Sequence, residues 1–233
     1  MKSEMTIDEK GTKNWKLPNG DYHRENGPAV VYLDGDKEWF VKGERHREDG
    51  PAIDYPQYGH KEWWIWGERH REDGPAMEFV KAPGDESINT HKEWWIGGER
   101  HRKGRPAIEY NDGGEEWYIE GKLHREDGPA LIGAHGRKEW YLYGFKHRLD
   151  GPSVTLLIGH KEWHLYGTEH TEEEFKRRIR DYKLKQLLSP TSESRDFKKT
   201  SESSYFEFYK KTLQIRDSSG ETKITINQSF DKF

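Results

Sequence analysis

The chain repeats one phrase: a tryptophan, a glycine four residues later, then His-Arg, and then Gly-Pro-Ala. One copy runs from Trp39 to Ala52 and another from Trp117 to Ala130. The repeated histidines lie 23, 24, 31, 23, 23 and 23 residues apart: His23, His46, His70, His101, His124, His147 and His170. A fixed period of this length is typical of a stacked array, in which no unit can bury its apolar face alone.

Each unit reads as a β-hairpin. After Pro-Ala, apolar residues alternate with a variable and often acidic one, as in Ile53-Asp54-Tyr55, which is the pattern of a half-buried strand. A glycine-containing turn follows, and a second strand around the repeated tryptophan ends at the repeated glycine. The sequence therefore predicts an all-β fold: an elongated single sheet, or solenoid, of six to seven hairpins over residues 15–170, after an N-terminal lead-in at 1–14.

The composition predicts a thin core. Only 31% of the residues are hydrophobic and 35% are charged, while ten tryptophans supply much of the apolar surface. The net charge of −4, with both signs interspersed, argues against a nucleic-acid partner. The chain has no cysteine, no basic-then-apolar start and no apolar run of the roughly 20 residues that a membrane span needs. We expect a soluble cytoplasmic protein with no membrane partner.

The chain changes character after the last repeat. Thr171 and Glu174 form the pattern of a capping box, which predicts a helix over residues 171–188 that caps the last hairpin. Residues 189–204 read as a linker rich in serine, threonine and charge, and 205–233 as a strand or hairpin segment. That segment is too small to fold alone. It would dock on the array, swap onto a second copy or become ordered on a partner.

The repeat resembles the MORN family, whose unit has a similar length. Residues Trp117 to His124 are similar to the aromatic strand, the turn and the histidine of that family's unit. An arginine follows the histidine where the family usually has glycine, and Gly-Pro-Ala replaces Gly-x-Gly. The chain therefore resembles the variant MORN-like repeats of bacterial, phage and giant-virus proteins, some of them proposed antitoxins. The resemblance implies a hairpin array that serves in assembly or dimerisation.

The second strand of each unit predicts two different faces. Alternation places the repeated tryptophan and an aliphatic residue two positions later on a core face: Trp39/Val41, Trp63/Ile65, Trp94/Ile96, Trp117/Ile119, Trp140/Leu142 and Trp163/Leu165. The opposite face carries Phe40/Lys42, Trp64/Trp66, Trp95/Gly97, Tyr118/Glu120, Tyr141/Tyr143 and His164/Tyr166. One possibility is that this aromatic stripe is covered, by the twist of the sheet, by the aliphatic parts of Lys and Glu side chains or by the C-terminal segment. The other is that the stripe binds a ligand or partner.

The repeated His-Arg pairs are interpreted as structural. Equivalent residues of neighbouring hairpins lie about 9.5 Å apart, which is too far for two histidines to share a zinc ion. The histidine would pack at the turn, and the arginine would reach the Glu-Asp of its own or the next copy, as in His46-Arg47-Glu48-Asp49. The sequence predicts no metal site, no cofactor and no catalytic residue.

The array is irregular at its third interval. Extra residues near 80–90 read as a loop, and Lys103-Gly104-Arg105 replaces the usual Glu-Asp-Gly. A positive patch beside aromatic rings could hold an anionic, nucleotide-like ligand or an acidic partner. The alternative is that this copy has changed by neutral drift and carries a tolerated surface loop. The candidate binding residues are Trp64, Trp66, Trp95, Arg102, Lys103, Arg105, Tyr118, Tyr141 and Tyr143.

The repetition favours a non-enzymatic function. Near-equivalent copies suit an extended contact better than a unique active site, so the first hypothesis is a protein-interaction, scaffold or inhibitor protein that presents an aromatic face and self-associates or binds a protein partner. The alternative is that the protein is a sponge or inhibitor that captures an anionic, nucleotide-like small ligand. It would then be a defence or toxin component of a phage or mobile element. An enzyme is disfavoured, because no nucleophile, base and orienting residue occur together.

Overall fold

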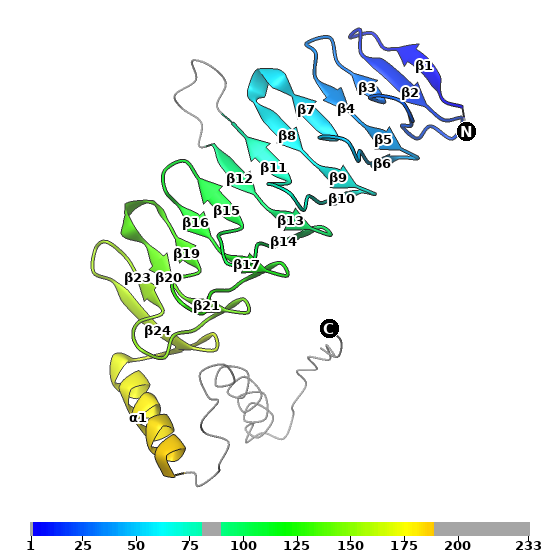
Figure 1. Cartoon of the computed structure of the whole chain (residues 1–233). Coiled ribbons are helices and arrows are strands. Elements are labelled where there is room, and N and C mark those ends of the chain that lie inside the picture. The colour runs from blue at the N-terminus through cyan, green and yellow to red at the C-terminus, as the bar shows by residue number, and fades with distance from the viewer. Residues whose placement is uncertain (1, 81–89, 189–233) are drawn as a thin grey trace, which may run out of the picture. The chain divides into compact units, whose positions relative to one another are not determined.

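The computed structural model describes residues 2–80 and 90–188. Within these residues, one long antiparallel sheet contains fifteen strands. In spatial order they are β1 (Glu4–Ile7), β2 (Lys13–Lys16), β3 (Val30–Val31), β4 (Lys37–Glu38), β7 (Ile53–Tyr55), β8 (His60–Glu62), β11 (Met77–Phe79), β12 (His91–Glu93), β15 (Ile108–Tyr110), β16 (Glu115–Glu116), β19 (Leu131–Ile132), β20 (Lys138–Glu139), β23 (Val154–Thr155), β24 (Lys161–Leu165) and β25 (Thr168–His170). The hairpins follow one another in a row (Figure 1), which confirms the predicted all-β repeat fold.

Each full unit also carries a small two-stranded hairpin along one edge of the row (Figure 1). The pairs are β5 (Phe40–Val41) with β6 (Glu44–Arg45), β9 (Trp64–Ile65) with β10 (Glu68–Arg69), β13 (Trp95–Ile96) with β14 (Glu99–Arg100), β17 (Tyr118–Ile119) with β18 (Lys122–Leu123), and β21 (Tyr141–Leu142) with β22 (Phe145–Lys146).

The predicted second strand is therefore divided at the repeated tryptophan. Trp63, for example, donates its N–H to the carbonyl of Ala76 and accepts a hydrogen bond from the N–H of His70. The strand changes its pairing at this residue, so the sheet strand ends and the small hairpin begins. In the last unit β24 runs through Trp163 without this division.

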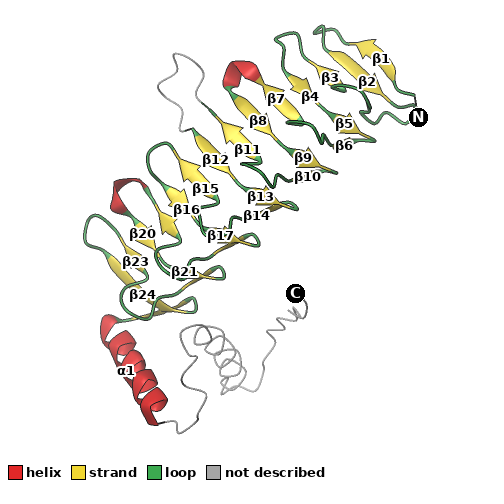
Figure 2. Cartoon of the chain, in the orientation of Figure 1, coloured by secondary structure: helices red, strands yellow, loops and turns green. Residues whose placement is uncertain are grey.

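Turn chemistry fixes the ends of the hairpins whose turns the structure describes. The small hairpins turn through two residues that both have positive φ, such as Trp66 (48°) and Gly67 (77°), as a type I′ turn requires. At the other end, two of the sheet hairpins turn through a short 3-10 segment, η1 (Pro56–Tyr58) and η2 (Ala134–Gly136), shown in Figure 2. The loop predicted within residues 81–87 lies outside the described residues.

The ends of the array differ from the expectation at one point. The predicted lead-in is part of the sheet, since β1 pairs with β2 over Glu4 to Ile7. At the other end, α1 (Glu172–Leu188) begins with the predicted capping box, in which the N–H of Glu174 donates to Oγ1 of Thr171 at 3.2 Å. No helix among the described residues is long and apolar enough to cross a membrane.

The array and the first turns of α1 belong to one compact unit that ends at Arg177. Whether α1 seals the last hairpin stays a prediction. The linker predicted at 189–204 and the strand segment predicted at 205–233 lie outside the described residues.

Candidate binding faces of the repeat array

One face of the sheet is built on a row of glutamates, each next to the repeated tryptophan in sequence. We call it the glutamate face; it carries Glu38, Glu62, Glu93, Glu116, Glu139 and Glu162 together with the rings two residues later, Phe40, Trp64, Trp95, Tyr118, Tyr141 and His164. In Cα register, Glu62 lies between Ile53 and Met77, and the other glutamates likewise alternate with aliphatic residues. The glutamate row is thus part of a thin core.

Glu62 shows how this row is held together. Its side chain is buried, and its carboxylate accepts hydrogen bonds from Nε2 of His60 (2.8 Å), Nε1 of Trp64 (2.7 Å) and Nε of Arg69 (3.0 Å). Burial would raise the pKa of Glu62, but these hydrogen bonds and the charge of Arg69 lower it to about 2. Glu93 repeats the arrangement with Trp95 and Arg100, and its pKa is also about 2.

Tyrosines supply donors in other units, alongside Arg45 at Glu38. Glu38 accepts from the hydroxyls of Tyr32 (2.9 Å) and Tyr55 (2.5 Å). Glu116 accepts from those of Tyr110 (3.0 Å) and Tyr118 (2.8 Å). Burial, together with the hydrogen bond to Glu116, raises the pKa of Tyr118 to about 12. Every one of these carboxylates therefore has more than one donor, as a buried charge requires.

Arginines from the small hairpins lie between the rings of neighbouring units. The guanidinium of Arg69 lies 4.9 Å from the ring centre of Trp64 and 5.2 Å from that of Trp95. Arg45 lies in the same way between Phe40 and Trp64, and Arg100 between Trp95 and Tyr118. The aromatic stripe predicted from the sequence is thus interleaved with arginines of its own array, and each arginine joins two units.

The opposite face, which we call the tryptophan face, follows a simpler pattern. Each repeated arginine covers the repeated tryptophan of its own unit at 3.5–4.1 Å from the ring centre: Arg24/Trp15, Arg47/Trp39, Arg71/Trp63, Arg102/Trp94, Arg125/Trp117 and Arg148/Trp140. The same arginine usually binds the aspartate two residues later, as Arg47 Nε does Asp49 at 2.7 Å. This confirms that the arginine reaches the acids of its own copy.

The predicted core face is correct in part. Leu142 and Leu165 are buried, and so is each alanine of Gly-Pro-Ala, which lies opposite a repeated tryptophan. Ile96, however, is 39% exposed, and the tryptophans themselves are half-buried under their arginines. The aliphatic residues Ile53 and Ile108 are buried on the glutamate face instead. Both faces therefore carry a thin layer of core.

The repeated histidines join each unit to the next. Nδ1 of a histidine accepts a hydrogen bond of 3.1–3.3 Å from a backbone N–H in the following hairpin turn: His23 from Lys42, His46 from Trp66, His70 from Gly97, His101 from Glu120, His124 from Tyr143 and His147 from Tyr166. This bond confirms their structural role. Burial lowers the pKa of His147 to about 4, so its imidazole is neutral, and the hydrogen bond that Nδ1 accepts from Tyr166 places the one ring proton on Nε2.

The structure divides the predicted binding residues among three places. Trp64, Trp95, Tyr118 and Tyr141 lie together on the glutamate face, as expected. Trp66 and Tyr143 do not continue it, because their positive φ breaks the alternation of the strand. Trp66, 54% exposed, stacks on His46 at 4.0 Å between ring centres, and Tyr143 stacks on His124 at 4.1 Å.

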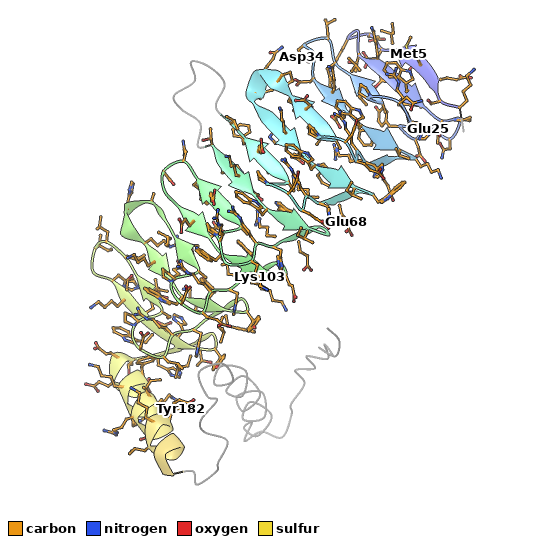
Figure 3. The ribbon with its side chains drawn as sticks, viewed as in Figure 1. Met5, Glu25, Asp34, Glu68, Lys103 and Tyr182 are labelled. Atoms are coloured by element: carbon orange, nitrogen blue, oxygen red, sulfur yellow. The ribbon has the colours of Figure 1, made fainter. Side chains whose placement is uncertain are left out.

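The predicted grouping of Arg102 with Trp95 is wrong. Arg102 covers Trp94, which precedes Trp95 in an extended chain and so points to the other face. Its guanidinium is also occupied, since Nη1 donates to Glu109 (2.5 Å) and to the carbonyl of Pro106 (3.0 Å). Lys103 and Arg105 are exposed, and Figure 3 shows Lys103 on the same edge as Glu25 and Glu68. Anion binding at this turn stays a prediction.

Three residues that hold the glutamate face were not predicted from the sequence: Arg45, Arg69 and Arg100. The signal was present, because each follows the glutamate by seven residues and the ring by five. The arrangement they build is a rigid row of flat rings and guanidinium groups.

No model of a known protein family matches the chain, and no curated protein is similar to it at a significant level.

Proposed function

We propose that this protein is a non-enzymatic binding protein or scaffold that presents its glutamate face to a protein partner. The observation that carries the proposal is the unbroken row of alternating rings and guanidinium groups from Phe40 to Tyr118. Tryptophan, tyrosine and arginine are the residue types that dominate binding energy at protein interfaces.

The rigidity of the row supports the same conclusion. Arg69 is held by a buried carboxylate and by the rings of two units, so it loses little conformational freedom when a partner binds. The row repeats from unit to unit, which suits an extended partner surface better than a small ligand. The resemblance to MORN-like repeats, which serve mostly in assembly, agrees with this proposal.

The test exchanges arginine and lysine on the two faces. The double variant Arg69→Lys with Arg100→Lys keeps the charges beside Glu62 and Glu93 but removes the planar groups that stack between rings. The matched control, Lys61→Arg with Lys92→Arg, makes the reverse exchange on the tryptophan face, where both lysines are exposed. Affinity capture followed by quantitative mass spectrometry then compares both variants with the unchanged protein, after circular dichroism has shown that all three are folded.

We expect a partner that the unchanged protein and the control retain equally and that the glutamate-face variant loses at least tenfold. A partner that both variants retain equally would contradict the proposal. So would a partner lost by the control alone, since it would then bind the tryptophan face.

A further inference from the structure

The terminal strand β1 is open on its outer side. All four of its residues are exposed, with Met5 at 50% and Ile7 at 59%, and its inner side pairs with β2. Among the described residues, no strand pairs with the outer side of β1. An exposed apolar strand edge is a template for pairing with another chain.

The ladder shows which backbone groups point outward. Met5 lies opposite Trp15, and Ile7 lies opposite Lys13. Trp15 donates its N–H to Ala29 and accepts from His23, so its hydrogen bonds point away from β1. In an antiparallel ladder, the residue opposite such a position also turns its N–H and C=O away. The N–H and C=O of Met5 therefore point outward, and the same alternation applies to Ile7.

The strand at the other end of the sheet is different. In β25, Thr168 and Glu169 are exposed, so a charge lies on this terminal strand, and the chain leaves the sheet at Glu172 to form α1. Charged residues on an edge strand discourage pairing with another chain. β1 carries one exposed charge as well, at Glu4, but both of its positions whose backbone points outward, Met5 and Ile7, have apolar side chains.

We propose that β1 pairs antiparallel with β1 of a second copy of this chain, with Met5 opposite Met5 at the two-fold axis. Charge complementarity selects this register. It places Lys2 opposite Asp8 of the second copy, and Ser3 opposite Ile7. Centring the pair on Thr6 would place Glu4 opposite Asp8, which is unfavourable because like charges directly opposite each other destabilise a ladder. The long sheet would then continue from one copy into the next.

This contact goes beyond the proposed function and leaves the glutamate face of both copies open. An edge pair of this length buries less surface than the roughly 1,200–2,000 Å² of a typical stable interface. The dimer is therefore expected to be weak and to depend on protein concentration.

The register is tested by disulfide cross-linking, because the chain has no cysteine of its own. Directly opposite residues of a hydrogen-bonded pair have Cα atoms about 5.5 Å apart, within the range of a disulfide. The full-length Met5→Cys variant is therefore expected to form a covalent dimer under mild oxidation. In the control, Ile7→Cys, the two cysteines lie four residues out of register, roughly 13 Å apart, and should stay unlinked.

Light scattering at several protein concentrations tests the non-covalent dimer. Met5→Pro removes an outward N–H that the β1–β2 ladder does not use, so the chain should fold and remain a monomer where the unchanged protein dimerises. Dimers that survive Met5→Pro would overturn the proposal and locate the contact elsewhere, residues 189–233 included. Equal cross-linking of Met5→Cys and Ile7→Cys would also overturn it. The Arg69→Lys, Arg100→Lys variant should dimerise normally. The dimer proposal and the partner proposal can therefore fail independently, and the two failures can be told apart.

Discussion

The two faces of the sheet use the same pair of residue types, arginine over an aromatic ring, for different purposes. On the tryptophan face, Arg47 covers Trp39 of its own unit and binds the exposed Asp49 two residues away. On the glutamate face, Arg69 lies between the rings of two units and binds a buried carboxylate. The tryptophan face therefore builds each unit, whereas the glutamate face couples one unit to the next. In a repeat array, stability is the sum of these two contributions.

The largest difference between the faces is expected at the buried carboxylates. Glu62→Ala leaves Arg69, His60 and Trp64 without their shared acceptor, and breaking a buried ion pair costs about 3–5 kcal/mol. We expect urea unfolding to show a loss of this order. The control, Glu48→Ala, removes an exposed acid and should change the free energy of unfolding by no more than about 0.5 kcal/mol. Equal losses in the two variants would show that the glutamate row is not a core.

The same carboxylates predict an acid dependence. The pKa of Glu62 and of Glu93 is about 2 in the folded chain, against an ordinary value of 4.5. A depressed pKa gives stability that is present above pH 4.5 and is lost as the pH falls toward 2. Glu62→Gln should remove part of this dependence, so its melting temperature should fall less steeply between pH 4.5 and 2 than that of the unchanged protein.

The fold was predictable from the sequence, but the division of roles between the faces was not. The period of the histidines and the glycine turns identify a hairpin array without any structure. The alternation Trp63, Trp64, Ile65 correctly separates two faces, yet it does not say which face is covered. The burial of Glu62 was not predicted, because a charged side chain is normally exposed. Its burial depends on Arg69 and on the neighbouring strands, where Ile53 and Met77 lie opposite it, and such contacts between strands are not visible in one repeat.

The position of Trp66 was missed for a local reason. Alternation holds only while the strand stays extended, and Trp66 occupies the first position of a type I′ turn with φ of 48°. Tryptophan is unusual there, since positive φ normally favours glycine, asparagine or aspartate. Glycine does occupy the equivalent position of one unit, at Gly97, but lysine, glutamate and tyrosine occur in others. The sequence therefore does not predict this turn, because most residues at its first position are not typical of positive φ.

A third prediction compares one arginine from each face. Arg69→Gln should lower the free energy of unfolding by about 2 kcal/mol, because it removes the two hydrogen bonds that Arg69 donates to the buried Glu62. Arg47→Gln should cost about 1 kcal/mol, the value of an exposed ion pair and one ring contact.

The shape of the unfolding transition separates the two roles further. Loss of coupling between units makes an array unfold less cooperatively. Arg69→Gln should therefore broaden the urea transition, whereas Arg47→Gln should shift it without broadening. Broadening by Arg47→Gln alone would reverse the roles of the two faces.

The smallest effect is expected at the irregular fourth copy, where Lys103-Gly104-Arg105 replaces Glu-Asp-Gly. In regular copies the glycine leaves room for the arginine that covers the tryptophan, since a Cβ at Gly50 or Gly74 would lie 2.8–2.9 Å from its guanidinium carbon and the arginine would have to shift. In the fourth copy the turn is different: Gly104 has φ of 70°, and Arg102 binds Glu109 in place of the missing aspartate. Restoring Glu-Asp-Gly lets the turn return to the conformation of the regular copies, in which the equivalent residues have no positive φ. The free energy of unfolding should then change by less than about 0.5 kcal/mol, since one exposed partner replaces another.

The same triple variant also tests whether Lys103 and Arg105 on the tryptophan face bind a ligand or have only a structural role. With Arg102 already bound to Glu109, we expect inorganic phosphate and ATP to raise the melting temperature of the unchanged protein and of the variant by the same small amount. A rise confined to the unchanged protein would instead show that Lys103 and Arg105 capture an anion. The tryptophan face would then carry a binding site of its own, and the division of roles between the two faces would have to be given up at this unit.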